Sequence, residues 1–256
     1  MRFRMLVTGS WEKDEVIIFV SEKTPAWPNA FYRQAKIFWQ QALKSEKKLF
    51  NGALSSLVSS HTNNNQLLLT LGRICYRDQM YSNNSMKNWK LEERNRYATR
   101  GLGISAVVET ADRQVLMIVR SQYVSENAGF LDVIGGHVHP EDHAKEGKPD
   151  VFYAIADEMH CELGIDFRNI KKTVCIGLIE NTEWLKPELV FVSNLNLAKA
   201  EVLECSKQAK ERFECSKMVS FAANQTGVLS FLDEYRQRCT PSAEGCLELY
   251  KIHCDE

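Results

Sequence analysis

The sequence lacks a large net charge of either sign, because 32 Lys and Arg residues nearly cancel 33 Asp and Glu residues, which leaves a formal net charge of −1. It therefore has no global basic field to attract nucleic acid or an anionic membrane surface, and we expect neither as a partner. No apolar run approaches the ~18–20 residues of a membrane span. The opening stretch MRFRMLVTGSWEKDEV reaches acidic residues without a long apolar run, so we expect no secretory signal and a cytoplasmic protein.

Paired cysteine motifs are missing as well. The eight cysteines are scattered, and no CxxC pair is joined by a second one, which argues against a zinc site. A chain of 256 residues needs no disulfide framework, so we interpret the cysteines as reduced thiols. With 44% hydrophobic and 25% charged residues, the composition is that of a globular protein with one large domain, or a main domain and a smaller companion.

The amino-terminal part contains patterns for both strands and a helix. Residues 15–22 are β-rich, residues 29–54 place Phe, Trp, Ala and Leu at helical spacing, and residues 66–78 are typical of a strand. The polar, charged stretch 81–100 is a domain boundary or a lid. These patterns predict an amino-terminal α/β domain over residues 1–95.

From residue 96 onward the pattern is dominated by strands. Two β-branched runs joined by a short turn predict a hairpin, and a further strand leads into a glycine pair at 135 and 136. The predicted strands cover residues 103–110, 114–124, 130–137, 173–181, 189–197, 218–222 and 247–252, with one helix before residue 165 and another over 228–239. Such an order predicts an α/β or α+β domain over residues 96–256, with a mixed sheet sandwiched between helices.

The helix before residue 165 carries the most informative residues. Pro149 or Asp150 can begin it, and Gly164 can end it in a left-handed cap. Glu158 and Glu162 are four residues apart and therefore project from one side of the helix. Two such carboxylates repel each other unless a cation lies between them, and Mg²⁺ prefers oxygen ligands. A metal site and a solvated acidic face are both open at this point.

The glycine pair and this helix together resemble the signature of the Nudix hydrolases, G-x5-E-x7-R-E-U-x-E-E-x-G-U, where U is aliphatic. Gly136 matches the first position, and DEMHCELGI (157–165) aligns with the last nine. The glycines also allow the backbone to approach a bound group closely.

Three positions and the spacing depart from that signature. Asp142 stands for the early Glu, Asp157 for the Arg, and Cys161 for the first of the paired glutamates. The spacer between Asp142 and Asp157 holds fourteen residues instead of seven. In the family, the Arg and the early Glu brace the loop as an ion pair. Both places are acidic here, so we expect that this brace does not form and that the long spacer positions the helix in another way. Sulfur is also a poor Mg²⁺ ligand.

Longer strings resemble one branch of that superfamily, the uridine diphosphate glucose pyrophosphatases. These strings are YRDQMYSN (76–83), RSQYVSENAGFLDVIGGHVHP (120–140) and CTPSAEGCLELY (239–250), and the resemblance extends from about residue 39 to residue 250 in the same order. The branch carries a lengthened Nudix box, so the long spacer is consistent with it. The resemblance implies Mg²⁺-dependent hydrolysis of UDP-glucose and UDP-galactose.

The resemblance also implies roles for single residues. Glu158 and Glu162 would bind the metal, and a further acid from another loop would complete the catalytic set. Glu214 is our first choice for that acid and Glu211 our second. The expected substrate-binding residues are Tyr76, Arg77, Arg120, Gly136, His137 and Ser242.

Three of the expected substrate-binding residues have an alternative role. Arg77 is as readily the ion-pair partner of Asp78 as a phosphate ligand, and Tyr76 is as readily a core residue as a stacking partner for uracil. His137 can brace its loop instead of donating to the diphosphate.

Two other function classes remain open. One is a Nudix hydrolase of another diphosphate, such as ADP-ribose, a dinucleotide or an RNA cap, the last being disfavoured by the absence of net positive charge. The other is a non-catalytic module that binds nucleotide sugars, which Cys161 and the lost brace favour.

Overall fold

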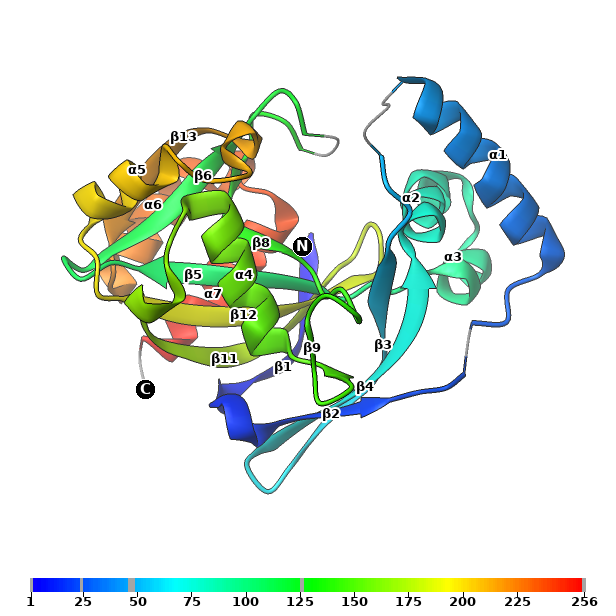
Figure 1. Cartoon of the computed structure of the whole chain (residues 1–256), viewed down its shortest axis with the longest axis horizontal. Helices are drawn as coiled ribbons and strands as arrows, with labels where there is room; N and C mark the ends of the chain where they lie inside the picture. Colours follow the sequence, from blue (N-terminus) through cyan, green and yellow to red (C-terminus); the bar gives the residue numbers. More distant parts are fainter. Residues whose placement is uncertain (1, 24, 46–48, 125–126, 255–256) are drawn as a thin grey trace.

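A mixed β-sheet with helices on both faces forms the larger part of the protein. The computed structural model describes residues 2–23, 25–45, 49–124 and 127–254, and within them the larger sheet has eight strands (Figure 1). The order is β1-β11-β12-β5-β6-β13, with β8 paired to β5 and β7 paired to β6. The bounds are β1 Phe3–Trp11, β5 Gly103–Glu109, β6 Gln114–Arg120, β7 Leu131–Asp132, β8 Ile134–His137, β11 Ile170–Asn181, β12 Lys186–Leu195 and β13 Cys215–Ala222. Only the β12–β5 pair is parallel among the pairs of this sheet in the described residues.

Alternation along the strands creates two apolar faces. On β5, Ile104, Ala106 and Val108 pack on one side, where helix α4 (Val151–Leu163) lies, whereas Val107 packs on the other. That other face is covered by α6 (Gln225–Tyr235) and α7 (Pro241–His253). The expected class, an α+β fold with a mixed sheet between helices, is confirmed.

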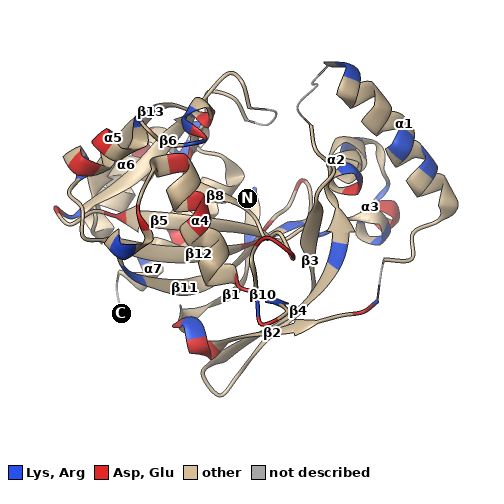
Figure 2. Ribbon diagram, in the orientation of Figure 1, with Lys and Arg blue, Asp and Glu red and all other residues tan. Residues whose placement is uncertain are grey.

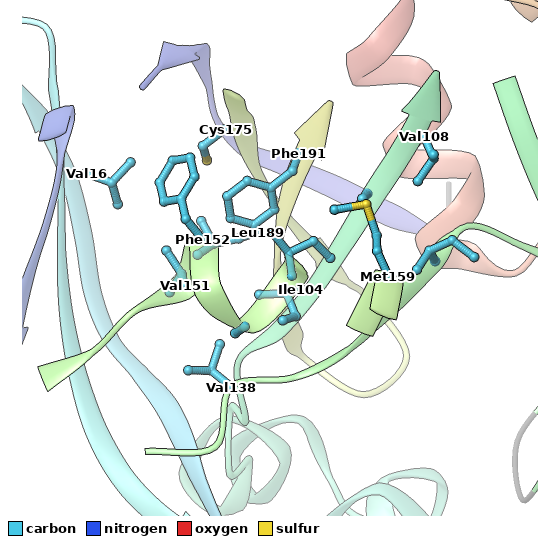
Figure 3. Packing of buried hydrophobic residues seen from close by; sticks show 14 of the residues in the cluster. Val16, Ile104, Val108, Val138, Val151, Phe152, Met159, Cys175, Leu189 and Phe191 are labelled. Carbon is cyan, nitrogen blue, oxygen red and sulfur yellow. The ribbon is translucent and has the colours of Figure 1, made fainter. Parts of the chain in front are cut away.

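The α4 face holds a tightly packed core (Figure 3). Phe152 of α4 meets Phe191 of β12 edge to face, with ring centroids 5.2 Å apart. Met159 lies further along the same apolar side of α4 and has no exposed surface. The helix is therefore held against the sheet by its apolar side, which leaves its acidic side for other contacts.

The amino-terminal part forms a smaller sheet of its own. Its order is β2-β4-β3, with β2 spanning Val16–Val20, β3 Ala53–Asn63 and β4 Gln66–Cys75. Three helices accompany it: α1 Asn29–Ser45, α2 Tyr76–Ser85 and α3 Leu91–Tyr97. Figure 2 shows basic residues along α1 and acidic residues along α4. Aromatic rings join these helices, as where Phe31 of α1 meets Tyr81 of α2 with centroids 5.1 Å apart.

Backbone hydrogen bonds connect the two sheets. Ser55 of β3 donates to the carbonyl of Val138 at 2.8 Å, and Leu102 donates to the carbonyl of Ser55 at 2.8 Å. The first strand crosses between the parts, because β1 pairs antiparallel with β11 of the larger sheet. The division into residues 1–95 and 96–256 stays a prediction, with β1 lying in the sheet of the second part.

Short elements complete the chain. The hairpin β9 Ala144–Lys145 and β10 Lys148–Pro149 precedes α4, and α5 spans Lys199–Ser206. The 3₁₀ turns are η1 Lys13–Glu15, η2 Met86–Asn88, η3 Phe167–Asn169, η4 Arg212–Glu214 and η5 Arg236–Arg238. Among the described residues, no helix combines the length and apolar character that a membrane crossing requires.

Three expected elements are corrected. The strand predicted to end at residue 78 ends at Cys75, after which α2 begins. The helix predicted over residues 29–54 is described over Asn29–Ser45; residues 46–48 lie outside the described part of the chain, and residue 54 belongs to β3. The strand predicted over 247–252 is wrong, because this segment is the second half of α7. Thr240 begins α7 by accepting a hydrogen bond from Ala243 N at 3.0 Å, and Pro241 occupies the first turn.

Candidate active site

Helix α4 is anchored at both ends by the residues that the sequence indicated. The side chain of Asp150 accepts from Phe152 N at 3.1 Å and from Tyr153 N at 3.0 Å, which satisfies two free donors of the first turn. Gly164 ends the helix with φ of 68°, the left-handed region that favours glycine. Both ends confirm the predicted start and stop of the helix.

Glu158 and Glu162 of α4 contact the backbone of strand β8. Gly135 N donates to Glu162 Oε1 at 3.3 Å, and the backbone N–H of His137 donates to the Glu158 carboxylate. A Cβ on Gly136 would overlap Glu158 Oε1, so the glycine leaves space for the carboxylate. The group that approaches the glycine backbone closely is thus a side chain of the protein itself.

Two further glutamates reach the same place from the segment before β13. Glu211 N donates to the carbonyl of Cys161 on α4 at 2.9 Å, and Ser121 N donates to the carbonyl of Glu214 at 2.7 Å. These backbone contacts hold η4 between α4 and the end of β6. They bring Glu211 and Glu214 towards Glu158 and Glu162, from which they are distant in the sequence.

The carboxylates strongly perturb one another. Burial and then the charges of Glu211, Asp157 and Glu214 raise the pKa of Glu158 to about 8. Burial and then the charges of Glu158 and Glu214 hold the pKa of Glu162 well above its usual range. Burial and Glu211 also raise the pKa of Glu214, which Arg120 partly offsets. A cation at the centre of this group would relieve both the burial cost and the repulsion.

The donor set fits a hard divalent cation. In the described part of the chain, no group of three or more His, Cys, Asp or Glu side chains is already arranged around a single metal position. Glu158, Glu162 and Glu214 nevertheless line one cavity and offer carboxylate oxygens, the ligands that Mg²⁺ prefers. Glu158 and Glu162 are therefore the residues that would hold a metal ion here.

A cavity of about 690 Å³ lies over these carboxylates. It is bounded by α4, β8 and the loop after β6, and also by α2 of the amino-terminal part. Of the residues expected at the site, the cavity is lined by Glu158, Glu162, Glu211, Glu214, Tyr76, Arg120, Gly136, His137 and Ser242. The structure therefore brings together residues that the sequence separates by more than 160 positions.

Arg77 is the exception. It is absent from the cavity wall, and its Nε donates to Asp78 Oδ1 at 2.8 Å. This is the alternative that the sequence left open, and we do not include Arg77 in the site. Tyr76, its neighbour, lines the cavity and also meets Trp39 edge-on, with ring centroids 6.3 Å apart.

The remaining expected residues have specific partners. Arg120 Nη1 donates to Asp132 Oδ2 at 3.0 Å, and Ser242 Oγ donates to Glu188 Oε2 at 2.5 Å. Burial, followed by the charge of Lys186, holds the pKa of His137 well below its usual value. His137 is therefore neutral at neutral pH and is suited to hydrogen bonding rather than to charge pairing.

Cys161 also lines the cavity and is half-buried. Burial, followed by the charges of Asp157 and Glu211, raises the pKa of its thiol to about 11. The side chain is consequently a neutral thiol at neutral pH.

Sequence reasoning missed two acidic residues of the cavity floor. Asp132 and Glu188 line the cavity and are buried, with 9% and 5% of their surface exposed. Glu188 accepts from Ser105 Oγ as well as from Ser242, and Asp132 accepts from Thr240 Oγ1 at 2.7 Å. The signal was present in the sequence, because each is a lone acid inside an apolar strand pattern.

No family model matches the chain. It is 27% identical over 210 residues to the Mus musculus protein named uridine diphosphate glucose pyrophosphatase NUDT22, covering 73% of this chain and 68% of that one. The Homo sapiens protein of the same name is 24% identical over 238 residues, with 83% and 78% covered. Nudix hydrolase 9 of Arabidopsis thaliana is 22% identical over 224 residues, with 75% and 72% covered.

Among solved structures, a Nudix hydrolase from Nitrosomonas europaea is 14% identical and covers 60% of this chain and 89% of its own, with a TM-score of 0.38. That score is low, and we base no inference on it. The curated relatives confirm the resemblance to the Nudix hydrolases that the sequence motifs predicted.

Proposed function

We propose that this relative of the Nudix hydrolases is a Mg²⁺-dependent pyrophosphatase that cleaves UDP-glucose and UDP-galactose to UMP and the sugar 1-phosphate. The observation that carries the proposal is the pair of buried Glu162 and half-buried Glu158, which contact the glycine strand at the wall of a cavity of about 690 Å³. The relatives named uridine diphosphate glucose pyrophosphatase support the choice of substrate.

The carboxylates of the site have different tasks in this proposal. Glu158 and Glu162 would hold the metal ion from one side of α4. When bound, the ion neutralises the charge of the diphosphate and lowers the pKa of a coordinated water. Glu214 lies on η4 across the cavity and takes the proton of the attacking water, with Glu211 as the second candidate for that role.

Basic and polar side chains of the cavity bind the substrate. Arg120, which lines the cavity and donates to Asp132, would contact the diphosphate, and neutral His137 would donate to a phosphate oxygen. Ser242, in the first turn of α7, would contact the sugar, and Tyr76 would stack on uracil. Gly136 gives the metal-binding carboxylate its space.

Two alternatives differ in their products. A hydrolase for another diphosphate would cleave ADP-ribose or a dinucleotide, whereas a non-catalytic module would bind UDP-glucose and leave it intact. We also propose the cytoplasm as the location, since all eight cysteines are free thiols, as expected in a reducing compartment.

One experiment separates these outcomes. The purified protein is incubated with UDP-glucose, UDP-galactose, ADP-ribose and a dinucleotide, with Mg²⁺ and with a chelator, and the products are separated by chromatography. We expect UMP and glucose 1-phosphate from UDP-glucose, only with Mg²⁺, at a kcat/KM above that for ADP-ribose. Equal or faster cleavage of ADP-ribose would overturn the substrate assignment, and binding of UDP-glucose without cleavage would overturn the enzymatic one.

A further inference from the structure

The long spacer before α4 contains one buried polar ring. His143 has 4% of its surface exposed and lies immediately before the β9–β10 hairpin, next to Asp142. It belongs to the segment that makes this spacer longer than the Nudix signature allows. A buried imidazole requires partners for its nitrogens, so its contacts indicate its role.

The backbone and ring of His143 together connect the loop to the helix. Its backbone N donates to the carbonyl of His139 at 3.0 Å, and its own carbonyl accepts from Asp150 N, at the beginning of α4, at 2.8 Å. Its Nδ1 accepts from His139 N at 3.1 Å. A ring nitrogen that accepts carries no proton, so the proton of the neutral ring is on Nε2.

That Nε2 faces the helix position where the Nudix signature has its arginine. His143 Nε2 lies 3.5 Å from Asp157 Oδ2. Burial, followed by the nearby His139, lowers the pKa of His143, so the ring is neutral at neutral pH and its N–H faces a carboxylate. The donor is therefore on the loop and the acceptor on the helix, at a separation that is the upper limit for a hydrogen bond.

We propose that His143 and Asp157 replace the lost arginine–glutamate brace with the two roles exchanged, the loop supplying the donor and the helix supplying the acceptor. The proposal rests on the proposed function, because the brace positions residues of that site. It assigns a role to Asp157, which stands where the family signature has an arginine.

The brace acts on Glu158 through geometry. Asp157 directly precedes Glu158, whereas Asp150 begins the helix seven residues earlier, about two turns away. Because His143 contacts both Asp150 and Asp157, it opposes rotation and sliding of α4 relative to the loop. The same loop starts from β8, against which Glu158 packs. His143 and Asp157 are thus positioning residues for the metal-binding carboxylate.

Two substitutions of His143 separate this role from simple support of the loop. His143→Gln places an amide N–H close to the position of Nε2 and keeps a donor for Asp157. His143→Asn places an amide oxygen close to the position of Nδ1 and keeps the acceptor for His139 N, but loses the donor. Glu146→Gln is the matched control, since this exposed acid lies in the same loop, between β9 and β10, and outside the cavity.

The measurements are kcat and KM for UDP-glucose, binding of Mg²⁺ alone by titration calorimetry, and the melting temperature. We expect His143→Asn to lower kcat roughly tenfold and to weaken Mg²⁺ binding, the size expected when one hydrogen bond is lost. KM should change little. His143→Gln should stay within about threefold of the parent in both quantities, and Glu146→Gln should leave Mg²⁺ binding and kcat within about threefold.

A double-mutant cycle tests the pair itself. With Asp157→Ala already present, His143→Asn should cause no further loss of Mg²⁺ affinity, because its partner is gone. Additive losses would overturn the pairing. If His143→Asn retained a higher kcat than His143→Gln, His143 would only support its loop. A lower melting temperature of His143→Asn with unchanged Mg²⁺ binding would show the same. If the parent protein cleaves no substrate, the proposed function fails, whereas the Mg²⁺ titrations still decide whether the brace exists.

Discussion

Gly136→Ala should remove activity and spare the fold. Gly136 lies on β8 outside the positive-φ region, so its backbone accepts an alanine without strain. The added Cβ would overlap Oε1 of Glu158 and lie 2.5 Å from its Cδ. These atoms are the far end of a flexible side chain, and the carboxylate can therefore swing away while the backbone stays in place.

The size of the effect follows from what is displaced. Changing a partner of a metal ligand typically costs about 10–100-fold in metal affinity or activity. Here the ligand itself leaves its position, so we expect kcat/KM for UDP-glucose to fall by about 100-fold or more. The melting temperature should change by only a few degrees, because the half-buried Glu158 carboxylate, which neighbouring carboxylates repel, moves outward.

Gly135→Ala is the internal comparison. Its Cβ would overlap the carbonyl oxygen of Ile104 and lie 3.0 Å from the Cα of Ser105, both on β5. Backbone cannot move aside as a side chain can, so this variant should lose stability strongly in urea unfolding. A Gly136→Ala protein that retains activity within threefold of the parent would refute the reasoning, and so would one that unfolds as readily as Gly135→Ala.

The remaining predictions address the ends and the acidic side of α4. Glu162→Gln should abolish Mg²⁺-dependent turnover in a protein with an unchanged circular dichroism spectrum; turnover within a few-fold of the parent would remove Glu162 from the metal site. Cys161→Glu should lower the Mg²⁺ concentration that gives half-maximal activity, because it adds a carboxylate to the cavity wall. An unchanged Mg²⁺ curve would mean that position 161 faces away from the metal. Asp150→Ala should cost about 1–2 kcal/mol of unfolding free energy in a urea titration, since it removes the helix cap and the partner of Lys13; a difference within experimental error would show that the cap is replaced by water.

Local signals in the sequence were sufficient for α4. Asp150 and Gly164 mark its ends, and the spacing of Glu158 and Glu162 places both carboxylates on one side. These features depend on contacts within a few residues, which is why the sequence reveals them. The catalytic roles of the site residues remain predictions.

The carboxyl-terminal helix was mistaken for a strand because its signals conflict. Leu247, Leu249 and the apolar residues around them fit a period of two as well as a period of 3.6 over so short a stretch. The deciding signal was the helix start at Thr240 and Pro241, several residues earlier. The approach of Glu211 to α4 was beyond local reasoning, because a backbone contact to Cys161 brings it there.

The first strand has a consequence for the order of events during synthesis. Phe3 pairs with Asn181 and Trp11 with Cys175, so β1 is made long before its partner. At about 5–20 residues per second, a ribosome needs on the order of ten seconds or more to reach β11. During that interval the strands of the smaller sheet can already pair with one another. Strand β1, in contrast, has unpaired backbone edges and exposes Phe3 and Trp11, which are buried in the folded protein. A chaperone that holds extended apolar segments would find its target in the nascent chain at this stage.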